Sequence, residues 1–133
     1  MNKQVFEPVE GDISALVADG VAERRDLEFK RELPGRKDED LKEFLADVTS
    51  FANTLGGDIV FGIGETDGVA TSIAGIDASA IADEMLRLEN EVRTGTEPRA
   101  SVRFQSVSLE SGRAVIVLRT LLGVKYRTRF VKT

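Results

Sequence analysis

The stretch DEDLKEFLADVTSFANTLGGDIVFGI, residues 38–63, joins an amphipathic helix to an apolar strand. Apolar residues recur at i, i+3, i+4 and i+7 spacing from Leu41 to Leu55, which predicts a helix over residues 38–55. Three acidic residues open this helix, where the helix dipole favours negative charge. The two glycines 56–57 end it, and the apolar run 58–63 predicts a central strand. The stretch therefore predicts a helix packed on a sheet.

Two further elements are expected before this stretch. A short helix is predicted over residues 11–20, with Asp12 as its N-cap. Residues 26–30 alternate charged and apolar side chains, a pattern typical of a half-buried strand with Leu27 and Phe29 facing the core. The N-terminal part of the chain thus contributes one helix and one strand.

The C-terminal part is expected to add a helix and a hairpin. Residues 65–68 predict a turn, and Asp77 is the expected N-cap of a helix that ends at Gly95. Two apolar segments, 102–109 and 114–118, are joined by a glycine-containing turn and predict a β-hairpin. The element order α-β-α-β-α-β-β predicts an α+β fold. We expect a two-layer sandwich, in which a mixed sheet of about four or more strands packs against two to three helices.

Composition limits both the organisation and the chemistry of the chain. With 133 residues, 41% of them hydrophobic, it is expected to form a single domain over residues 1–120, followed by a basic tail over residues 121–133. It has no cysteine and no histidine, which excludes disulfides, thiolate or imidazole metal ligands and Ser-His-Asp catalysis. No apolar run is long enough for a membrane span and no signal-peptide pattern is found, so a cytoplasmic location is expected.

Charge is unevenly distributed along the sequence. Residues 1–90 carry a net charge of −11 and residues 91–133 a net charge of +6, which together give −5. Arginines alternate with aromatic residues in the basic part, a composition that suits phosphate contacts and base stacking. Four of these arginines are the candidates for nucleic-acid binding: Arg99, Arg103, Arg113 and Arg119. The alternative is a solvated hairpin and tail whose charge offsets the acidic half.

Two other patterns were considered for chemistry. The glycines at 56, 57, 62 and 64 lack the lysine and hydroxyl that end a P-loop, which favours a structural role over phosphate binding. Glu23, Glu28 and Glu65 lie near the ends of predicted strands. If those strands are neighbours, the three carboxylates would suit Mg²⁺ or Mn²⁺. Exposed glutamates on the polar face of a strand are the alternative.

Two motifs at a characteristic separation indicate a family. Leu27-Glu28-Phe29-Lys30, followed by the segment 51–63 (FANTLGGDIVFGI), resembles the signature of the Schlafen AlbA_2 domain, an AlbA-like domain described as DNA-binding. Gly75-Ile76 and Pro98 also match, and the resemblance covers roughly residues 10–120.

The resemblance implies an AlbA-like fold and a module that binds DNA or RNA, often within proteins described as transcriptional regulators or as ATP-binding. In animal Schlafen proteins a related domain supplies three carboxylates to a metal-dependent ribonuclease. By motif these carboxylates correspond to Glu23, Glu28 and Glu65. The resemblance also marks Lys30 as a phosphate contact. Because animal Schlafen proteins pair two such lobes, it implies a homodimer. Three functions therefore remain open: nucleic-acid binding, a Mg²⁺- or Mn²⁺-dependent ribonuclease, and an ATP-binding regulatory module.

Overall fold

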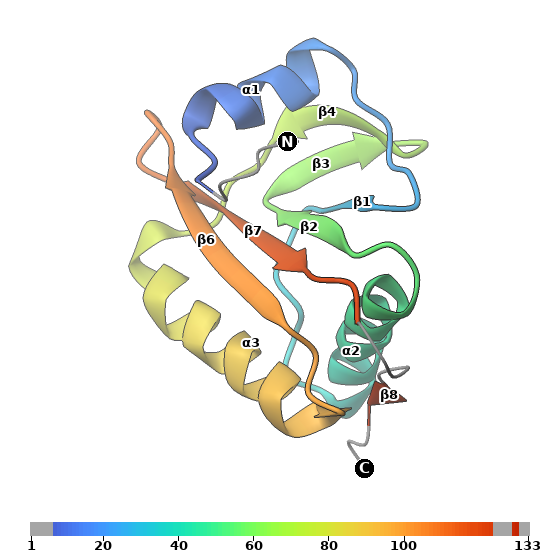
Figure 1. Ribbon diagram of the computed structural model, residues 1–133. Coiled ribbons are helices and arrows are strands. Elements are labelled where there is room, and N and C mark those ends of the chain that lie inside the picture. Colours follow the sequence, from blue (N-terminus) through green and yellow to red (C-terminus); the bar gives the residue numbers. More distant parts are fainter. Residues whose placement is uncertain (1–6, 124–128, 131–133) are drawn as a thin grey trace.

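The computed structural model describes residues 7–123 and 129–130 (Figure 1). Within these ranges the chain forms three α-helices, one 3₁₀ turn and eight strands. The helices are α1 (Glu10–Ala18), α2 (Asp38–Asn53) and α3 (Ile81–Gly95), and the 3₁₀ turn η1 (Ala78–Ala80) precedes α3. The strands are β1 (Leu27–Lys30), β2 (Gly57–Phe61), β3 (Ile63–Thr66), β4 (Val69–Ile73), β5 (Thr96–Glu97), β6 (Val102–Ser108), β7 (Ala114–Thr120) and β8 (Arg129–Phe130).

The main sheet has four strands in the order β1-β2-β7-β6. β1 and β2 are parallel and are connected through α2, as a parallel pair requires a crossover. β7 pairs antiparallel with both β2 and β6, so the sheet is mixed and β7 is a central strand. The predicted α+β fold, with helices on a mixed sheet, is confirmed. None of the helices in the described ranges combines the length and apolar character of a membrane span.

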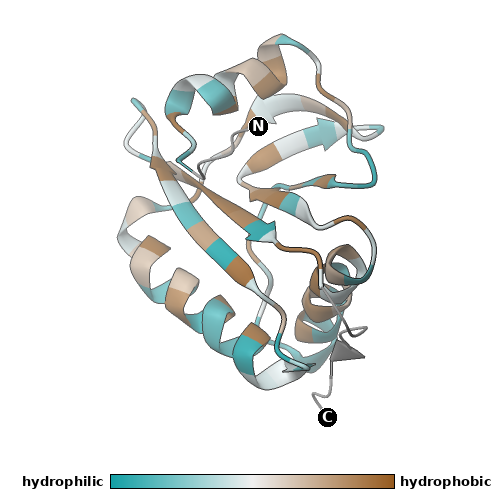
Figure 2. Cartoon of the chain, in the orientation of Figure 1, coloured by the Kyte–Doolittle hydropathy of each residue, from teal (hydrophilic) through white to brown (hydrophobic). Residues whose placement is uncertain are grey.

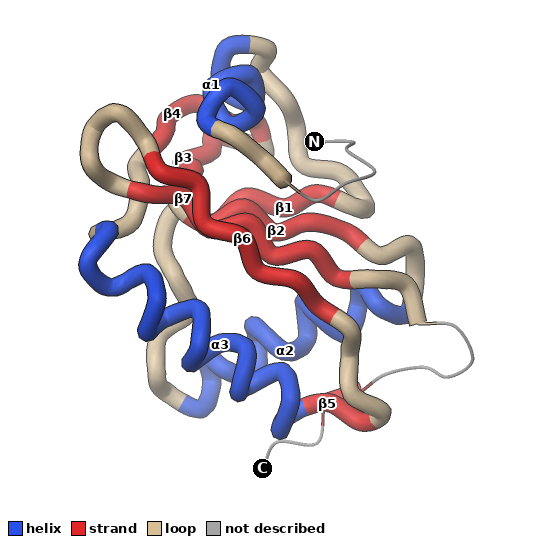
Figure 3. Tube along the Cα trace, turned by 60° about the vertical axis from the view of Figure 1, so that its left-hand side comes forward, coloured by secondary structure: helices blue, strands red, loops and turns tan. Residues whose placement is uncertain are grey.

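Two cores lie on opposite faces of the sheet. α2 and α3 cover one face, where Phe44 and Leu88 pack against Ile59 and Leu118. The bands of hydrophobic and hydrophilic residues along α3 follow this arrangement, and α2 and α3 lie together below the sheet in Figure 3 (Figures 2 and 3). α1 and the β3–β4 hairpin cover the other face, around residues such as Val60. The alternation of side chains along each strand therefore supplies both cores.

The helix boundaries have local causes. α2 ends at Asn53, as the glycines predict, because Gly56 adopts a positive φ of 75° and its N–H donates to the Phe51 carbonyl. Asp77 accepts from the Ser79 N–H, as expected of a cap, and starts η1. The N-cap prediction for Asp12 is wrong. Val9 occupies that position, and the Asp12 carboxylate accepts from the Val9 N–H at 2.8 Å, as the third residue of a helix does in a capping box.

A hairpin missing from the sequence prediction follows β2. Gly62, with φ of 109°, breaks the apolar run, and β3 then pairs with β4 through the turn at Asp67-Gly68. Both turn residues have positive φ, as in a type I′ turn, for which Asp-Gly is a preferred pair. The predicted turn at residues 65–68 is therefore the tip of a hairpin. Most of the predicted basic tail lies outside the described residues.

Candidate functional site

A tight turn before β1 brings two of the candidate glutamates together. Arg24 and Leu27 exchange two backbone hydrogen bonds at 3.0 and 3.1 Å, so the chain reverses between them. The residues on either side of this bridge are Glu23 and Glu28, which therefore lie opposite each other. The Glu23 N–H donates to the Gly68 carbonyl, which ties this segment to the β3–β4 hairpin. That hairpin carries Glu65.

Glu23, Glu28 and Glu65 line one cavity of about 460 Å³, together with Lys30 and Arg31. The fold thus brings all three predicted carboxylates to the same hollow. Each of them also has a partner of its own. Glu23 accepts from the Phe29 N–H at 2.9 Å, Glu65 accepts from the Gly68 N–H, and Glu28 lies 3.4 Å from the Lys30 ammonium.

These separate partners decide whether the carboxylates fit a metal ion as they lie. Carboxylate oxygens are the correct donor type for Mg²⁺ or Mn²⁺. However, Glu23 and Glu65 turn their oxygens toward backbone N–H groups, and Glu28 faces an ammonium group. In the part of the chain that the structure describes, no three carboxylates converge into a metal site. The side chains do not fit a metal ion in the described arrangement.

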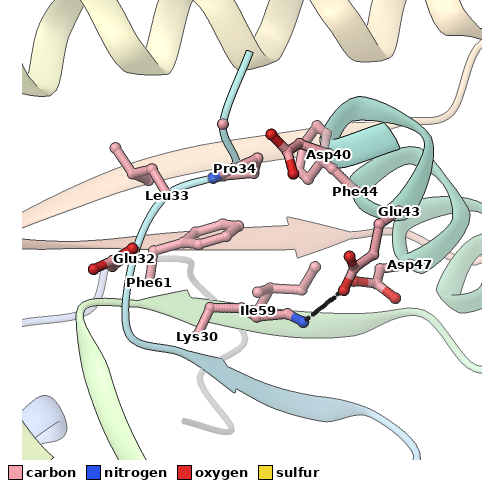
Figure 4. A pocket seen from close by; sticks show the side chains of 11 residues that line it. Lys30, Glu32, Leu33, Pro34, Asp40, Glu43, Phe44, Asp47, Ile59 and Phe61 are labelled. Atoms are coloured by element: carbon pink, nitrogen blue, oxygen red, sulfur yellow. Dashed lines mark ion pairs between the residues drawn. The ribbon is translucent and has the colours of Figure 1, made fainter. Parts of the chain in front are cut away.

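Lys30 lies among three carboxylates rather than one. Its Nζ is 3.4 Å from Glu28, 3.6 Å from Glu43 and 3.9 Å from Asp47, the last two on α2 (Figure 4). Partial burial acts to lower the pKa of Lys30, but the neighbouring carboxylates outweigh it and the pKa is raised. Burial, and then the charge of Glu28, raise the pKa of Asp47 to about 6. We call these four residues the Lys30 cluster.

A second cavity, of about 350 Å³, adjoins the Lys30 cluster (Figure 4). It lies between the end of β1, the loop of residues 31–37 that crosses over to α2, and α2 itself, and we call it the crossover cavity. Phe44 and Phe61 lie at its apolar side, with ring centroids 6.4 Å apart. Four carboxylates line it, from Glu32, Asp40, Glu43 and Asp47.

A third cavity, of about 280 Å³, contains two arginines. Arg113 lines it and donates to the carbonyls of Ala74 at 3.1 Å and Gly75 at 3.0 Å. Arg31 lines both this cavity and the one with the three glutamates, so it connects the two hollows. Within the described ranges, Arg31 makes no side-chain hydrogen bond or ion pair.

The remaining predicted arginines lie elsewhere. Arg119 donates to both oxygens of Asp58, at 2.8 and 2.9 Å, which occupies much of its guanidinium. Arg103 is exposed and stands opposite Arg119 across the β6–β7 ladder. Arg99 is exposed in the loop before β6. The five predicted basic residues therefore form no single patch, and only Lys30 and Arg113 line the described cavities.

Sequence reasoning missed Arg31, Glu43 and Asp47. Arg31 directly follows the Leu27–Lys30 motif, so its position after a strand was a usable signal. Glu43 and Asp47 are four residues apart on one face of α2, a spacing that is visible in the sequence. Nothing in the sequence, however, places that face beside Lys30.

The fold and these cavities define a class: an α+β domain with an acidic and basic groove at the edge strand of its sheet. The family follows from comparison with known proteins. Residues 23–125 match the family model described as "Schlafen, AlbA_2", and the chain belongs to this family. This confirms the resemblance inferred from the two motifs. Membership suggests a module of the nucleic-acid-binding type.

Comparison with solved structures gives one listed similarity. The crystal structure of the DIP2311 protein from Corynebacterium diphtheriae is 18% identical, with a TM-score of 0.49. The match covers 90% of this chain and 23% of that one, so this chain spans less than a quarter of the length of the similar structure. No curated protein matches the chain.

Proposed function

We propose that the protein is a nucleic-acid-binding module, and that a DNA or RNA strand lies over the two cavities joined by Arg31. The observation that supports this most directly is the position of Arg31, which lines both hollows and makes no ion pair among the described residues. A guanidinium group in this situation is available to bind a phosphate bidentately. Arg113, fixed by the Ala74 and Gly75 carbonyls, would provide a second phosphate contact.

Lys30 has a different role in this proposal from the one the sequence indicated. Its ammonium is surrounded by Glu28, Glu43 and Asp47, so a phosphate would have to compete with three carboxylates. Arg119 is likewise engaged by Asp58. We therefore assign the main phosphate contacts to Arg31 and Arg113. Arg99 and Arg103 remain exposed candidates for additional contacts.

The experiment is fluorescence anisotropy with labelled single-stranded RNA, hairpin RNA and duplex DNA over a range of salt concentrations. Arg31→Ala is expected to weaken binding by about tenfold at low salt and to reduce the slope of log affinity against log salt by about one. Arg25→Ala is the matched control, because Arg25 is exposed on the neighbouring turn but lines neither cavity. Equal losses in the two variants, or binding that does not respond to salt, would contradict the proposal.

A metal-dependent ribonuclease is the second candidate, favoured by the cavity that Glu23, Glu28 and Glu65 share. Binding of Mg²⁺ or Mn²⁺ would require these side chains to turn from their present partners. RNA incubated with each ion and with EDTA tests this candidate. Cleavage lost in Glu28→Gln would support it, and cleavage that persists in that variant would rule it out. ATP binding, a homodimer, a role in transcriptional regulation and a cytoplasmic location stay predictions.

A further inference from the structure

The crossover cavity has walls that are held in place independently of any ligand. Arg87, on α3, donates to the carbonyl of Pro34 at 2.6 Å and to that of Gly35 at 3.3 Å. Glu84 in turn binds Arg87 at 2.6 Å and also lies 3.5 Å from Arg36. The crossover loop is therefore fastened to α3, so the cavity is preformed.

The charges around the cavity are not balanced. Its lining includes four carboxylates but a single cation, Lys30. Lys30 is within 4 Å of Glu43 and Asp47 only, and at distances longer than a direct hydrogen bond. In the described ranges, Glu32 and Asp40 form no ion pair or side-chain hydrogen bond. The lining keeps an excess of negative charge that a second cation would neutralise.

The arrangement of the carboxylates describes the shape of that cation. Asp40, Glu43 and Asp47 are spaced i, i+3 and i+7, which places them in a row along one face of α2 (Figure 4). Seven residues of helix extend about 10 Å. Leu33, Phe44 and Phe61 provide apolar surface beside this row. A ligand that fits both features is a chain of methylene groups with ammonium groups along its length.

Lys30 already shows this chemistry within the protein. Its aliphatic stem lies along the cavity and its ammonium group approaches the carboxylates of α2 (Figure 4). A compact hydrated metal ion would use the carboxylates but not the apolar side. Polar and apolar lining together therefore favour an alkylammonium ligand over a metal ion.

We propose that the crossover cavity binds a linear aliphatic polyamine, with its ammonium groups on Asp40, Glu43 and Asp47 and its methylene groups against Leu33, Phe44 and Phe61. This site is separate from the cavities assigned to nucleic acid, and it does not depend on the proposed function. Polyamine binding there would leave Arg31 and Arg113 accessible. The two sites share only the neighbourhood of Lys30.

Isothermal titration of the full chain with spermidine, at fixed ionic strength, tests the proposal. We expect saturable one-to-one binding, reduced about tenfold or more in Glu43→Gln and in Asp47→Asn, since each loses one charge-assisted contact. Glu39→Gln is the matched control, because Glu39 lies on the same helix but does not line the cavity. Thermal melts of each variant establish that it is folded before titration.

Further arms of the experiment separate the alternatives. Mg²⁺ at equal charge should neither bind in the cavity nor displace spermidine, and displacement would show a general cation effect and overturn the proposal. An equal loss of affinity in Glu39→Gln would overturn it in the same way. A lysine-containing peptide that binds where spermidine does not would replace the polyamine by a protein partner. No heat of binding with up to millimolar spermidine would also overturn it.

Discussion

Two ionic groups in this domain differ in how their charges are matched. Asp58 and Arg119 form a one-to-one pair with two direct hydrogen bonds, and both side chains are largely buried, with 11% and 19% exposed. The Lys30 cluster instead has three carboxylates around one ammonium at 3.4 to 3.9 Å, and is more open to solvent. The first group is complete by itself, whereas the second keeps unneutralised charge.

This difference separates a structural role from a binding role. The Asp58–Arg119 pair joins the neighbouring strands β2 and β7, where Asp58 stands opposite Arg119 in the ladder. A charge-matched pair of this kind gains nothing from a ligand. The Lys30 cluster lies at the mouth of a cavity, where an additional cation would lower the electrostatic energy. The predictions below test this contrast, beginning with the largest expected effect.

Removing one member of the matched pair should be costly. Arg119→Met leaves the Asp58 carboxylate buried without its partner and should lower the free energy of unfolding by about 3 kcal/mol. Urea denaturation measures this change. Arg103→Met, opposite on β6 and exposed, is the control and should change stability by less than about 0.5 kcal/mol. Similar losses in the two variants would contradict the structural role of the pair.

The Lys30 cluster should make stability depend on pH. Burial, and then Glu28, raise the pKa of Asp47 to about 6, above the value of about 3.9 for an unfolded chain. The folded state therefore holds this proton more tightly, and its contribution to stability is present below pH 4 and is lost as the pH rises through about 6. Asp47→Asn removes that loss, so the variant should gain stability relative to the natural sequence across this window.

Denaturation curves at several pH values between 4 and 7 measure this effect. We expect a relative gain on the order of 1 kcal/mol, since Asp47 is partly exposed and solvent screens its charge. Lys30→Met removes the one nearby cation and should move the transition to higher pH. A difference between natural sequence and Asp47→Asn that stays constant with pH would show that Asp47 titrates normally.

The smallest expected effect concerns a polar group with no partner. The Thr120 hydroxyl is buried and forms no hydrogen bond within the described ranges. Thr120→Val should therefore stabilise the protein by about 1 kcal/mol in thermal or urea unfolding. Thr96→Val is the matched control. The Thr96 hydroxyl donates to the Val92 carbonyl at 2.8 Å and accepts from the Ala100 N–H at 2.9 Å, so this change should destabilise.

The parts of the fold that were predictable are those with a local signal. The amphipathic pattern and the glycines at its end predict α2, and alternation predicts the buried Leu27 and Phe29 of β1. The β3–β4 hairpin had a signal in Asp67-Gly68, but the apolar run through Gly62 was interpreted as one strand. The capping role of Asp12 was misassigned because a carboxylate at the first or third position of a helix leaves the same mark in a sequence.

The site was predictable only where a motif could be recognised. Glu23, Glu28 and Glu65 follow from the family resemblance, and the fold brings them to one cavity. The Arg119 side chain has its partner 61 residues away, at Asp58, and only strand register brings the two together. The same limit applies to Glu43 and Asp47, whose position beside Lys30 depends on how α2 packs against β1.

The place of β7 in the sheet has a consequence for the order in which the chain folds. β2 meets β7 only after the whole of α3 and β6 has been synthesised, so the central pairing of the sheet is among the last to become available. Until then β1 and β2 form a two-stranded parallel ribbon with their apolar residues uncovered. Closing such long loops delays the reward for the entropy lost, which favours slow folding in a single late step.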